Sequence, residues 1–447
     1  MGRRRRGKPR PIDLPAFECE IESLSSDGRG VTHIDGKSTF VAGALPGEIV
    51  SARYIKRKRH FDDALAEKVI VESADRVKPG CDSFGLCGGC VLQHLKSEKQ
   101  IEFKLNTLLE NFSRIGNVQA ETVDEPVTAN EWGYRRRARL GVRYVRKKEK
   151  VLVGFRELQS SFVALMSRCE ILHPVVGEKL ESLAELIASM SVYNRIAQIE
   201  VAISDKVNAL VFRNLEPLTD DDTQKLKDYA QQNEFAIYLQ SGGPDTVVAL
   251  YPEELVLDYQ LSKFDLRLEY EPGDFTQVNF EINNKMIERA MQWLQPCEND
   301  RVLDLFCGIG NFTLPLARSA SYVLGIEGSA AMVEKAKHNA RINKLDNVEF
   351  EACNLADEDL AEEWKKRAFN KVLIDPPRSG AQEIMPNIAK LKPEIIVYIS
   401  CHPGSLARDA GILVNEYGYQ LKKATVLDMF PHTAHVESIA LFVNGKG

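Results

Sequence analysis

Apolar and polar residues alternate along the first part of the chain. Residues 12–73 contain short alternating runs, such as FECEIESL and ALAEKVIVES, that are separated by glycine-rich turns. Short strands divided by turn residues at this spacing are typical of a small β-barrel of the OB type. We therefore expect residues 12–73 to form an OB-like barrel, an architecture that often binds single-stranded nucleic acid.

The pattern becomes mixed over residues 74–274. The run SEKQIEFKLNTLLENFSRIG has helical periodicity, as do GEKLESLAELIASM and DDTQKLKDYAQQ, whereas ARLGVRYV, IEVAIS and NALVFR read as strands. This range predicts a central α+β domain without an obvious catalytic motif.

From residue 275 to residue 447, short apolar runs alternate with helical patterns. The runs RVLDLF, YVLGIE, KVLIDPP and IIVYISC are each followed by a loop and a helical stretch. Strands that alternate with helices predict a mostly parallel sheet with helices on both faces. The whole chain is therefore expected to be multidomain, ending in a Rossmann-like α/β domain.

Charge is distributed unevenly, although the net charge is only −6 over 447 residues. Basic residues gather at residues 3–11, at Arg53 to Phe61 and at Tyr134 to Lys150, and the last two clusters include Tyr54, Phe61, Tyr134 and Tyr144. Positive charge next to aromatic rings suits a phosphate backbone with stackable bases. The alternative for any one cluster is a solvated basic face. Three clusters together favour a nucleic acid as a partner.

Two features that the sequence lacks indicate in which compartment the protein is expected to work. No window resembles a signal peptide or the roughly 18 uncharged apolar residues of a membrane helix. Nine cysteines without a signal peptide argue against a disulfide framework and favour metal or catalytic roles. We expect a cytoplasmic protein that contacts no membrane.

Polar residues follow the strands of the last domain, where ligands of open α/β sheets bind. The run VLDLFCGIGN ends in a turn at Gly308 and Gly310, and the next strand ends at Glu327, an acid suited to a ribose diol. This turn is not the GxGxxG of dinucleotide binders. Together these residues predict a nucleoside cofactor, and a tight turn beside a surface acid is the alternative. Asn354 ends the third strand, where its amide suits an adenine edge.

Three further residues offer chemistry near the same strand ends. Asp375 precedes two prolines, Cys401 follows a strand, and Glu437 comes just before the last apolar run. A cysteine at such a position suits a nucleophile, and a semi-buried carboxylate suits a general base. His432 and His435 with Glu437 lack the helical spacing of a zinc site, so a metal is disfavoured there.

The motifs DFTQVN, DLFCGIGNFTLPLA, DPPRSG, SCHPGSLARD and DMFPHTAHVE resemble those of the S-adenosylmethionine-dependent RNA uracil-C5 methyltransferases. The stretch DGRGVTHIDGKSTFVAGALPGE resembles their TRAM barrel, and the resemblance as a whole favours enzymes of 23S ribosomal RNA. It implies that Cys401 is the nucleophile and Glu437 the proton acceptor. It also implies that S-adenosylmethionine or the target base contacts Gln277, Phe306, Asn311, Glu327, Asn354 and Asp375.

One departure from the family pattern is visible. The family usually has Ser-Cys-Asn-Pro with a later Thr, whereas His402 and Ser405 stand in those places here. The departure leaves the nucleophile unchanged and puts the local polar contacts in doubt.

Three cysteines lie within ten residues in CDSFGLCGGC, namely Cys81, Cys87 and Cys90, and Cys169 is a fourth candidate. Four thiolates suit either zinc or an iron–sulfur cluster. The family resemblance implies a [4Fe-4S] cluster held by these four, and zinc, recruiting His94 or His173, is the alternative. Because methyl transfer needs no electron, we expect a structural or RNA-positioning role.

The resemblance implies methylation of uracil C5 in 23S ribosomal RNA by a monomer that does not act on DNA. Addition of a cysteine thiolate to C6 makes C5 nucleophilic, and a base then removes the C5 proton. An exocyclic-amine methyltransferase would usually place an aromatic residue where Arg378 stands, and a cytosine-C5 enzyme would carry a cysteine beside the prolines. A non-catalytic RNA-binding module is the remaining alternative.

Overall fold

The computed structural model describes residues 12–355, 364 and 366–445. The basic residues 3–11 lie outside this part of the chain. Within it, no helix combines the length and the apolar character needed to cross a membrane.

The first body is a six-stranded sheet with the order β1-β5-β6-β4-β3-β2. Alternate residues of its strands point inward, so that Val41, Ala52 and Ala64 form its own small core. Its strands are β1 (Phe17–Glu20), β2 (Ser23–Leu24), β3 (Gly30–Ile34), β4 (Lys37–Ala42), β5 (Ile49–Arg57) and β6 (Phe61–Val71). The alternating pattern of the sequence thus correctly predicts strands throughout this range.

The second body is a six-stranded sheet with the order β13-β12-β11-β10-β8-β9. The apolar residues of α3 and α4 cover one of its faces. Its elements are β8 (Arg137–Val145), β9 (Lys150–Gly154), α2 (Pro174–Gly177), α3 (Leu180–Ala188), β10 (Ile196–Ile203), β11 (Asn208–Asn214), α4 (Asp220–Asn233), β12 (Phe235–Gln240) and β13 (Val247–Tyr251).

The third body is an eight-stranded sheet with the order β18-β17-β16-β19-β20-β22-β21-β7. Strands β16 to β20 run parallel, whereas β22 is antiparallel to both of its neighbours. The sheet is therefore mixed. Its strands are β7 (Thr122–Val123), β16 (Arg301–Leu305), β17 (Tyr322–Glu327), β18 (Val348–Ala352), β19 (Lys371–Ile374), β20 (Ile395–Ser400), β21 (Tyr419–Leu427) and β22 (Glu437–Asn444).

Helices cover both faces of this sheet, as the sequence predicts, because successive residues of each buried strand point to opposite sides. One face packs on α5 (Phe280–Leu294), α6 (Thr313–Ala317) and α7 (Ala330–Ile342). The other packs on α1 (Ser97–Asn111), α9 (Met385–Leu391) and α10 (Pro403–Gly411).

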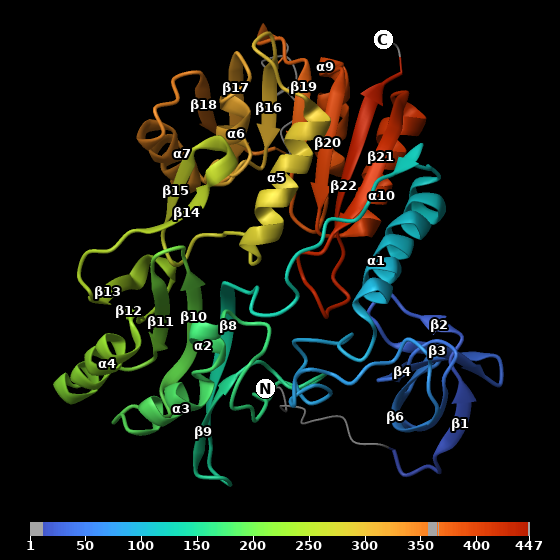
Figure 1. The fold of residues 1–447 in the computed structure, drawn as a ribbon, viewed down its shortest axis with the longest axis vertical. Coiled ribbons are helices and arrows are strands. Elements are labelled where there is room, and N and C mark those ends of the chain that lie inside the picture. The colour runs from blue at the N-terminus through green and yellow to red at the C-terminus, as the bar shows by residue number, and fades with distance from the viewer. Residues whose placement is uncertain (1–11, 356–363, 365, 446–447) are drawn as a thin grey trace.

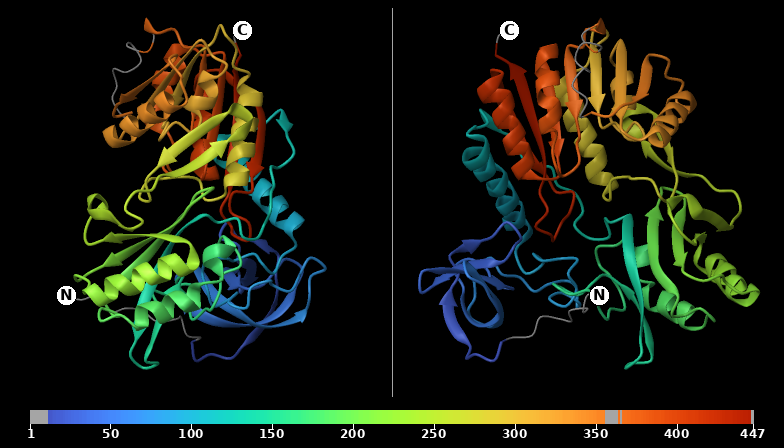
Figure 2. Two further views of the ribbon diagram at one scale, coloured as in Figure 1. Left: turned by 60° about the vertical axis from the view of Figure 1, so that its left-hand side comes forward. Right: turned by 180° about the vertical axis from the view of Figure 1, so that it is seen from behind.

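The segments around α1 and β7 come from the range that the sequence assigns to the central domain, yet they pack on the C-terminal sheet. Leu108 and Phe112 are fully buried against α10, and β7 pairs with β21. The divisions at residues 73/74 and 274/275 stay predictions, and these contacts join the segments around α1 and β7 to the C-terminal sheet. In Figures 1 and 2 the first two sheets lie at the same end of the third.

Candidate active site

A cavity of about 700 Å³ opens at the carboxyl ends of β16, β17, β19 and β20. Its wall brings together residues that are far apart in the sequence. Seven of the eight expected cofactor or catalytic residues line it, namely Gln277, Phe306, Asn311, Glu327, Asp375, Cys401 and Glu437. Asn354 follows β18, is exposed and is not part of this lining.

The loop after β16 takes a shape that depends on its glycines. Gly308 and Gly310 have φ angles of 55° and 99°, and Phe306 shares this left-handed region at 65°. The Glu327 carboxylate accepts a hydrogen bond from the Gly308 N–H at 3.2 Å, which ties the end of β17 to the loop. Backbone groups and a carboxylate thus face the same side of the cavity.

Asp304, in the run VLDLFCGIGN that precedes the glycine turn, is not among the residues that line the cavity. It is fully buried and accepts a hydrogen bond from the Thr313 hydroxyl. Burial raises its pKa to about 8. Asp304 therefore links the end of β16 to the start of α6, on the two sides of the glycine loop.

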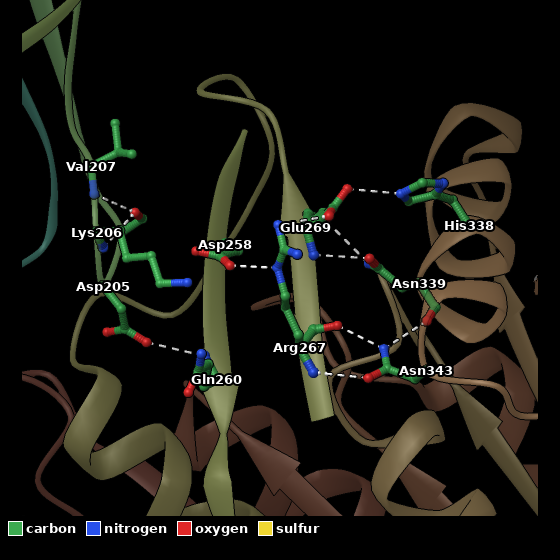
Figure 3. Close-up of polar contacts among 11 residues, drawn as sticks. Asp205, Lys206, Val207, Asp258, Gln260, Arg267, Glu269, His338, Asn339 and Asn343 are labelled. Atoms are coloured by element: carbon green, nitrogen blue, oxygen red, sulfur yellow. Dashed lines mark hydrogen bonds and ion pairs between the residues drawn. The ribbon is translucent and has the colours of Figure 1, made fainter. Parts of the chain in front are cut away.

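The β-hairpin of β14 (Leu257–Leu261) and β15 (Leu266–Tyr270) supports the loop from the side. Figure 3 shows Asn339 and Asn343 of α7 directed at β15. The Asn339 amide accepts from the Glu269 N–H at 2.8 Å and donates to the Ile309 carbonyl at 3.1 Å. Because Asn339 is fully buried, it fixes the hairpin, the helix and the glycine loop to one another.

Asn311 lies in the same loop and is held by residues that sequence reasoning missed. Its amide donates to the Asn283 side chain at 2.9 Å, and its oxygen accepts from the Tyr259 hydroxyl at 2.8 Å. Asn283 lies on α5 and Tyr259 on β14, so no local motif in the sequence indicates the contact.

Cys401 lies directly after β20 and before α10. Burial, together with the charges of Glu437 and Asp375, raises the pKa of its thiol to about 11, and Arg378 acts in the opposite direction. His402 begins α10, because its Nδ1 accepts the Ser405 backbone N–H at 3.1 Å. A histidine thereby provides the helix cap, which resolves the doubt about the local contacts.

Glu437 and Asp375 are carboxyl groups with perturbed proton affinity. Burial and the charge of Asp375 raise the pKa of Glu437 well above its usual value. Burial also raises the pKa of Asp375 to about 7. Carboxyl groups in a cleft whose pKa is raised in this way are typical of sites of acid–base catalysis.

Phe275 and Phe430 line the cavity without having been singled out in the sequence, and Arg378 and His435 line it although sequence reasoning assigned them no role in the site. The Arg378 guanidinium lies 3.0 Å from the Nδ1 of His435, a contact across 57 positions of the sequence. Phe275 is 71% exposed, the largest exposure among the apolar side chains of the described residues. Phe275 and Arg378 lie inside DFTQVN and DPPRSG, so the motifs themselves were the available signal.

The four cysteines expected to hold a cluster lie near one another. Cys87 and Cys169 are buried in the same apolar cluster, and Cys90 packs against it. Burial raises the pKa of Cys90 to about 12, and the charges of Cys169, Cys87 and Cys81 act in the same direction. Within the described residues, no three His, Cys, Asp or Glu side chains are arranged to hold a single metal ion.

The basic clusters at Arg53 to Phe61 and Tyr134 to Lys150 are partly paired with acids, as in Arg53–Glu67 and Arg139–Glu200. Tyr134 was expected beside the RNA, and this is wrong. Its ring is only 7% exposed, and its hydroxyl donates to the Pro431 carbonyl at 3.2 Å.

Comparison with known proteins places this geometry in a family. The family model described as tRNA (Uracil-5-)-methyltransferase matches residues 96–444. The protein of Alkalilimnicola ehrlichii named 23S rRNA (uracil(1939)-C(5))-methyltransferase RlmD is 51% identical over 443 residues, covering 99% of both chains. The protein of the same name from Hahella chejuensis is 49% identical over 448 residues, again covering 99% of each.

A solved structure agrees in fold over nearly the whole chain. The tRNA (uracil-54, C5)-methyltransferase of Pyrococcus abyssi, in complex with S-adenosyl-L-homocysteine, superimposes with a TM-score of 0.74 at 26% identity. The match covers 95% of this chain and 99% of that one. The chain therefore belongs to the tRNA (uracil-5-)-methyltransferase family and is an S-adenosylmethionine-dependent uracil-C5 RNA methyltransferase.

Proposed function

We propose that this protein methylates C5 of one uridine in 23S ribosomal RNA through a covalent adduct between Cys401 and C6. The single observation that carries the proposal is that Cys401, Glu437 and the glycine loop line one cavity. The names of relatives that match over 99% of both chains supply the RNA class.

The cofactor side of the cavity fits a nucleoside. The Glu327 carboxylate can accept hydrogen bonds from a ribose diol, and the Phe306 ring, at the start of the glycine loop, lines the same cavity. Gly308 and Gly310 allow a ligand to approach the backbone closely. S-adenosylmethionine, held here, supplies the electrophilic methyl group. Asn354 stays a proposed adenine contact beyond the lining residues.

Cys401 acts as the nucleophile. Its raised pKa means that the free site holds a neutral thiol at pH 7, and Arg378 is the cation that favours the thiolate. Addition of the thiolate to C6 moves the electrons of the 5,6 double bond toward O4. C5 then becomes nucleophilic enough to accept a methyl group.

Glu437 acts as the base that completes the reaction. After methylation, its carboxylate takes the C5 proton, the C–H electrons reform the 5,6 double bond, and the Cys401 thiolate leaves C6. A high pKa makes the ionised group a stronger base for this step. Asp375 and Gln277 orient the polar edge of the ring from the opposite wall.

The target base has to leave its stack to enter the cavity, so other parts of the chain hold the surrounding RNA. The first sheet carries the TRAM-like sequence, and the cluster Arg53 to Phe61 runs from the end of β5 to the start of β6. The proposal assigns RNA binding to residues 12–73 and to the central domain over 74–274, and methyl transfer to residues 275–447.

We also propose that Cys81, Cys87, Cys90 and Cys169 bind a [4Fe-4S] cluster. Their thiols share one partly buried neighbourhood, as their mutual effects on pKa indicate. Each cysteine of such a cluster binds a different iron, so the four sulfurs need not converge on one ion. The proposed role is structural, and a zinc ion is the alternative that metal analysis distinguishes.

Anaerobic metal and sulfide analysis tests the cluster, with about four iron and four sulfide expected per chain. Replacing Cys87 by Ser is expected to lower thermal stability or RNA affinity. Unchanged stability and RNA affinity with loss of turnover alone would contradict the structural role, and zinc without sulfide would replace the cluster.

The covalent mechanism is tested with an RNA fragment that carries 5-fluorouridine at the target position. Fluorine cannot leave as a proton does, so the wild type is expected to remain attached to the RNA on a denaturing gel. Cys401→Ala should give no attached RNA. Methylation of C5 by Cys401→Ala would contradict the proposed nucleophile.

A further inference from the structure

The segment between β21 and β22 forms one wall of the cavity. Residues 428–436, here called the base loop, end directly at Glu437, and Phe430 and His435 of this loop line the cavity. In Figure 1 the loop, coloured red, projects from the lower edge of the C-terminal sheet toward the first two sheets. Glu437 is the first residue of β22 and pairs with Leu427 of β21, so the base loop sets the path of the chain that enters this position.

Helix α1 holds the base loop through two buried polar side chains. The Lys104 ammonium, 1% exposed, donates to Asp428 at 2.6 Å and to the Phe430 carbonyl at 2.9 Å. The Gln100 amide, 4% exposed, accepts from the His432 N–H at 3.0 Å and donates to the Leu95 carbonyl at 2.8 Å. Gln100 thus links the base loop to the segment that follows the cysteines.

The cysteine loop, defined as residues 80–92, reaches the same point. The backbone N–H groups of Val91 and Leu92, one and two residues after Cys90, both donate to the His432 carbonyl, at 2.9 and 3.0 Å. His432 has a φ of 65°, a left-handed conformation that a non-glycine residue adopts at a cost. Its surroundings, and not its own preference, therefore hold this conformation.

A third contact comes from Trp132. Its ring lies against the His432 ring with a centroid distance of 4.1 Å and a tilt of 36° between the ring planes. On the cysteine loop, a Cβ placed on Gly80 would lie only 2.9 Å from the Trp132 Cη2. The indole is thus in close contact with the cysteine loop and with the base loop.

We propose that the cysteine loop and Gln100 position the general base, in addition to any role in binding RNA. Both act through the backbone of His432, five residues before Glu437, and neither is among the residues that line the cavity. The inference rests on the proposed roles of Cys401 and Glu437. It assigns the cysteine loop to one step of the reaction, the removal of the C5 proton.

A defect in removal of the C5 proton has a specific experimental consequence. When Glu437 is misplaced, C6 addition and methyl transfer still proceed, because they require Cys401 and not the base. The C5–H bond then breaks slowly, the thiolate stays on C6, and the methylated RNA remains attached to the enzyme. A defect in folding or RNA binding alone lowers the amount of this adduct instead of raising it.

Gln100→Leu tests the inference on ordinary uridine RNA, with Gln240→Leu as the matched control. Gln240 is a buried glutamine of the central sheet whose amide bonds to the Gly243 carbonyl. Gln100→Leu is expected to lower kcat about 10-fold, part of the roughly 10²–10⁴-fold that a general base contributes. The KM for S-adenosylmethionine should stay within about twofold, and a methylated covalent adduct should accumulate. The control should do neither.

Gly80→Ala is the second variant, because one added methyl group pushes Trp132 toward the base loop without removing a hydrogen bond. It should raise the adduct as well, by a smaller factor. The inference is overturned if Glu437→Gln accumulates adduct while folded Gln100→Leu and Gly80→Ala do not. Failure of the proposed covalent mechanism gives a different result, because the wild type would then form no adduct with 5-fluorouridine RNA.

Discussion

Glu437 is a carboxyl group placed where its charged form is disfavoured. In the folded chain it keeps its proton to a higher pH than the usual value of 4.5, because it is buried and faces Asp375. In the unfolded chain the proton is lost first as the pH rises. The free energy of unfolding therefore falls from about pH 4.5 upward, through the raised pKa of the folded chain.

Glu437→Gln should consequently stabilise the protein without its ligands. The melting temperature is expected to rise at pH 8 by roughly 1 °C, which corresponds to about 1 kcal/mol in a chain of 447 residues. The gain should be smaller at pH 5, where the carboxyl of the wild type is closer to neutral in both states. Calorimetry at the two pH values measures the difference, and a larger gain at pH 5 would contradict the assigned direction.

Single residues were predictable where a motif surrounds them. Cys401 and Glu437 follow or precede apolar runs, and the structure brings both to the cavity. The contact between Arg378 and His435 was not predictable, because it joins residues from two separate loops. Asn354 shows the reverse case, since a strand end in the sequence does not guarantee a place in the lining.

At the scale of elements, α7 connects the hairpin to the glycine loop through Asn339. Asn339 bonds both β15 and the Ile309 carbonyl, whereas Asn343 bonds only the Arg267 backbone of β15 among these partners. Asn339→Leu leaves buried partners unsatisfied and should lower stability by about 1–3 kcal/mol. It should also raise the KM for S-adenosylmethionine by about 10-fold, the effect of roughly 1.4 kcal/mol.

Asn343→Leu is the control for that variant. It loosens the hairpin but leaves the Ile309 carbonyl bonded to Asn339, so the KM for S-adenosylmethionine should change less than about twofold. Equal increases in KM for the two variants would show that the hairpin, and not the glycine loop, sets cofactor affinity. Steady-state kinetics with saturating RNA provides the comparison.

The order of strands and helices in the last domain follows from the hydrophobic pattern, since buried parallel strands leave continuous apolar runs. The position of α1 does not. Its sequence predicts a helix, but its apolar face does not reveal that the partner is α10, almost 300 residues later. Contacts of this range depend on the whole fold.

At the scale of the molecule, the three bodies meet near the base loop. A Cβ on Gly28 of the first sheet would lie 3.0 Å from the Leu92 Cδ2 and 3.5 Å from the Ala434 Cβ. The first sheet, the cysteine loop and the base loop are therefore in contact. The surfaces proposed to bind RNA therefore belong to the same region as the wall that carries Glu437.

Long-range charge should govern RNA affinity. Arg143 and Arg146 are exposed, line a cavity of about 510 Å³ with Tyr144, and form no ion pair with other described residues. Replacing both by Ala should weaken RNA binding and reduce the slope of log affinity against log salt by about 1.4. Arg139→Ala, whose guanidinium already pairs with Glu200, should change the slope less. An unchanged slope for the double variant would remove β8 from the RNA interface.

The central claim is that Cys401 activates C5 of a uridine in 23S ribosomal RNA. The most direct measurement is tritium release from unmodified 23S RNA labelled at uridine C5, with purified protein, S-adenosylmethionine and Cys401→Ala as control. We predict one tritium released per methyl group incorporated by the wild type and none by Cys401→Ala. Methyl incorporation without tritium release would move the reaction to another atom and contradict the account.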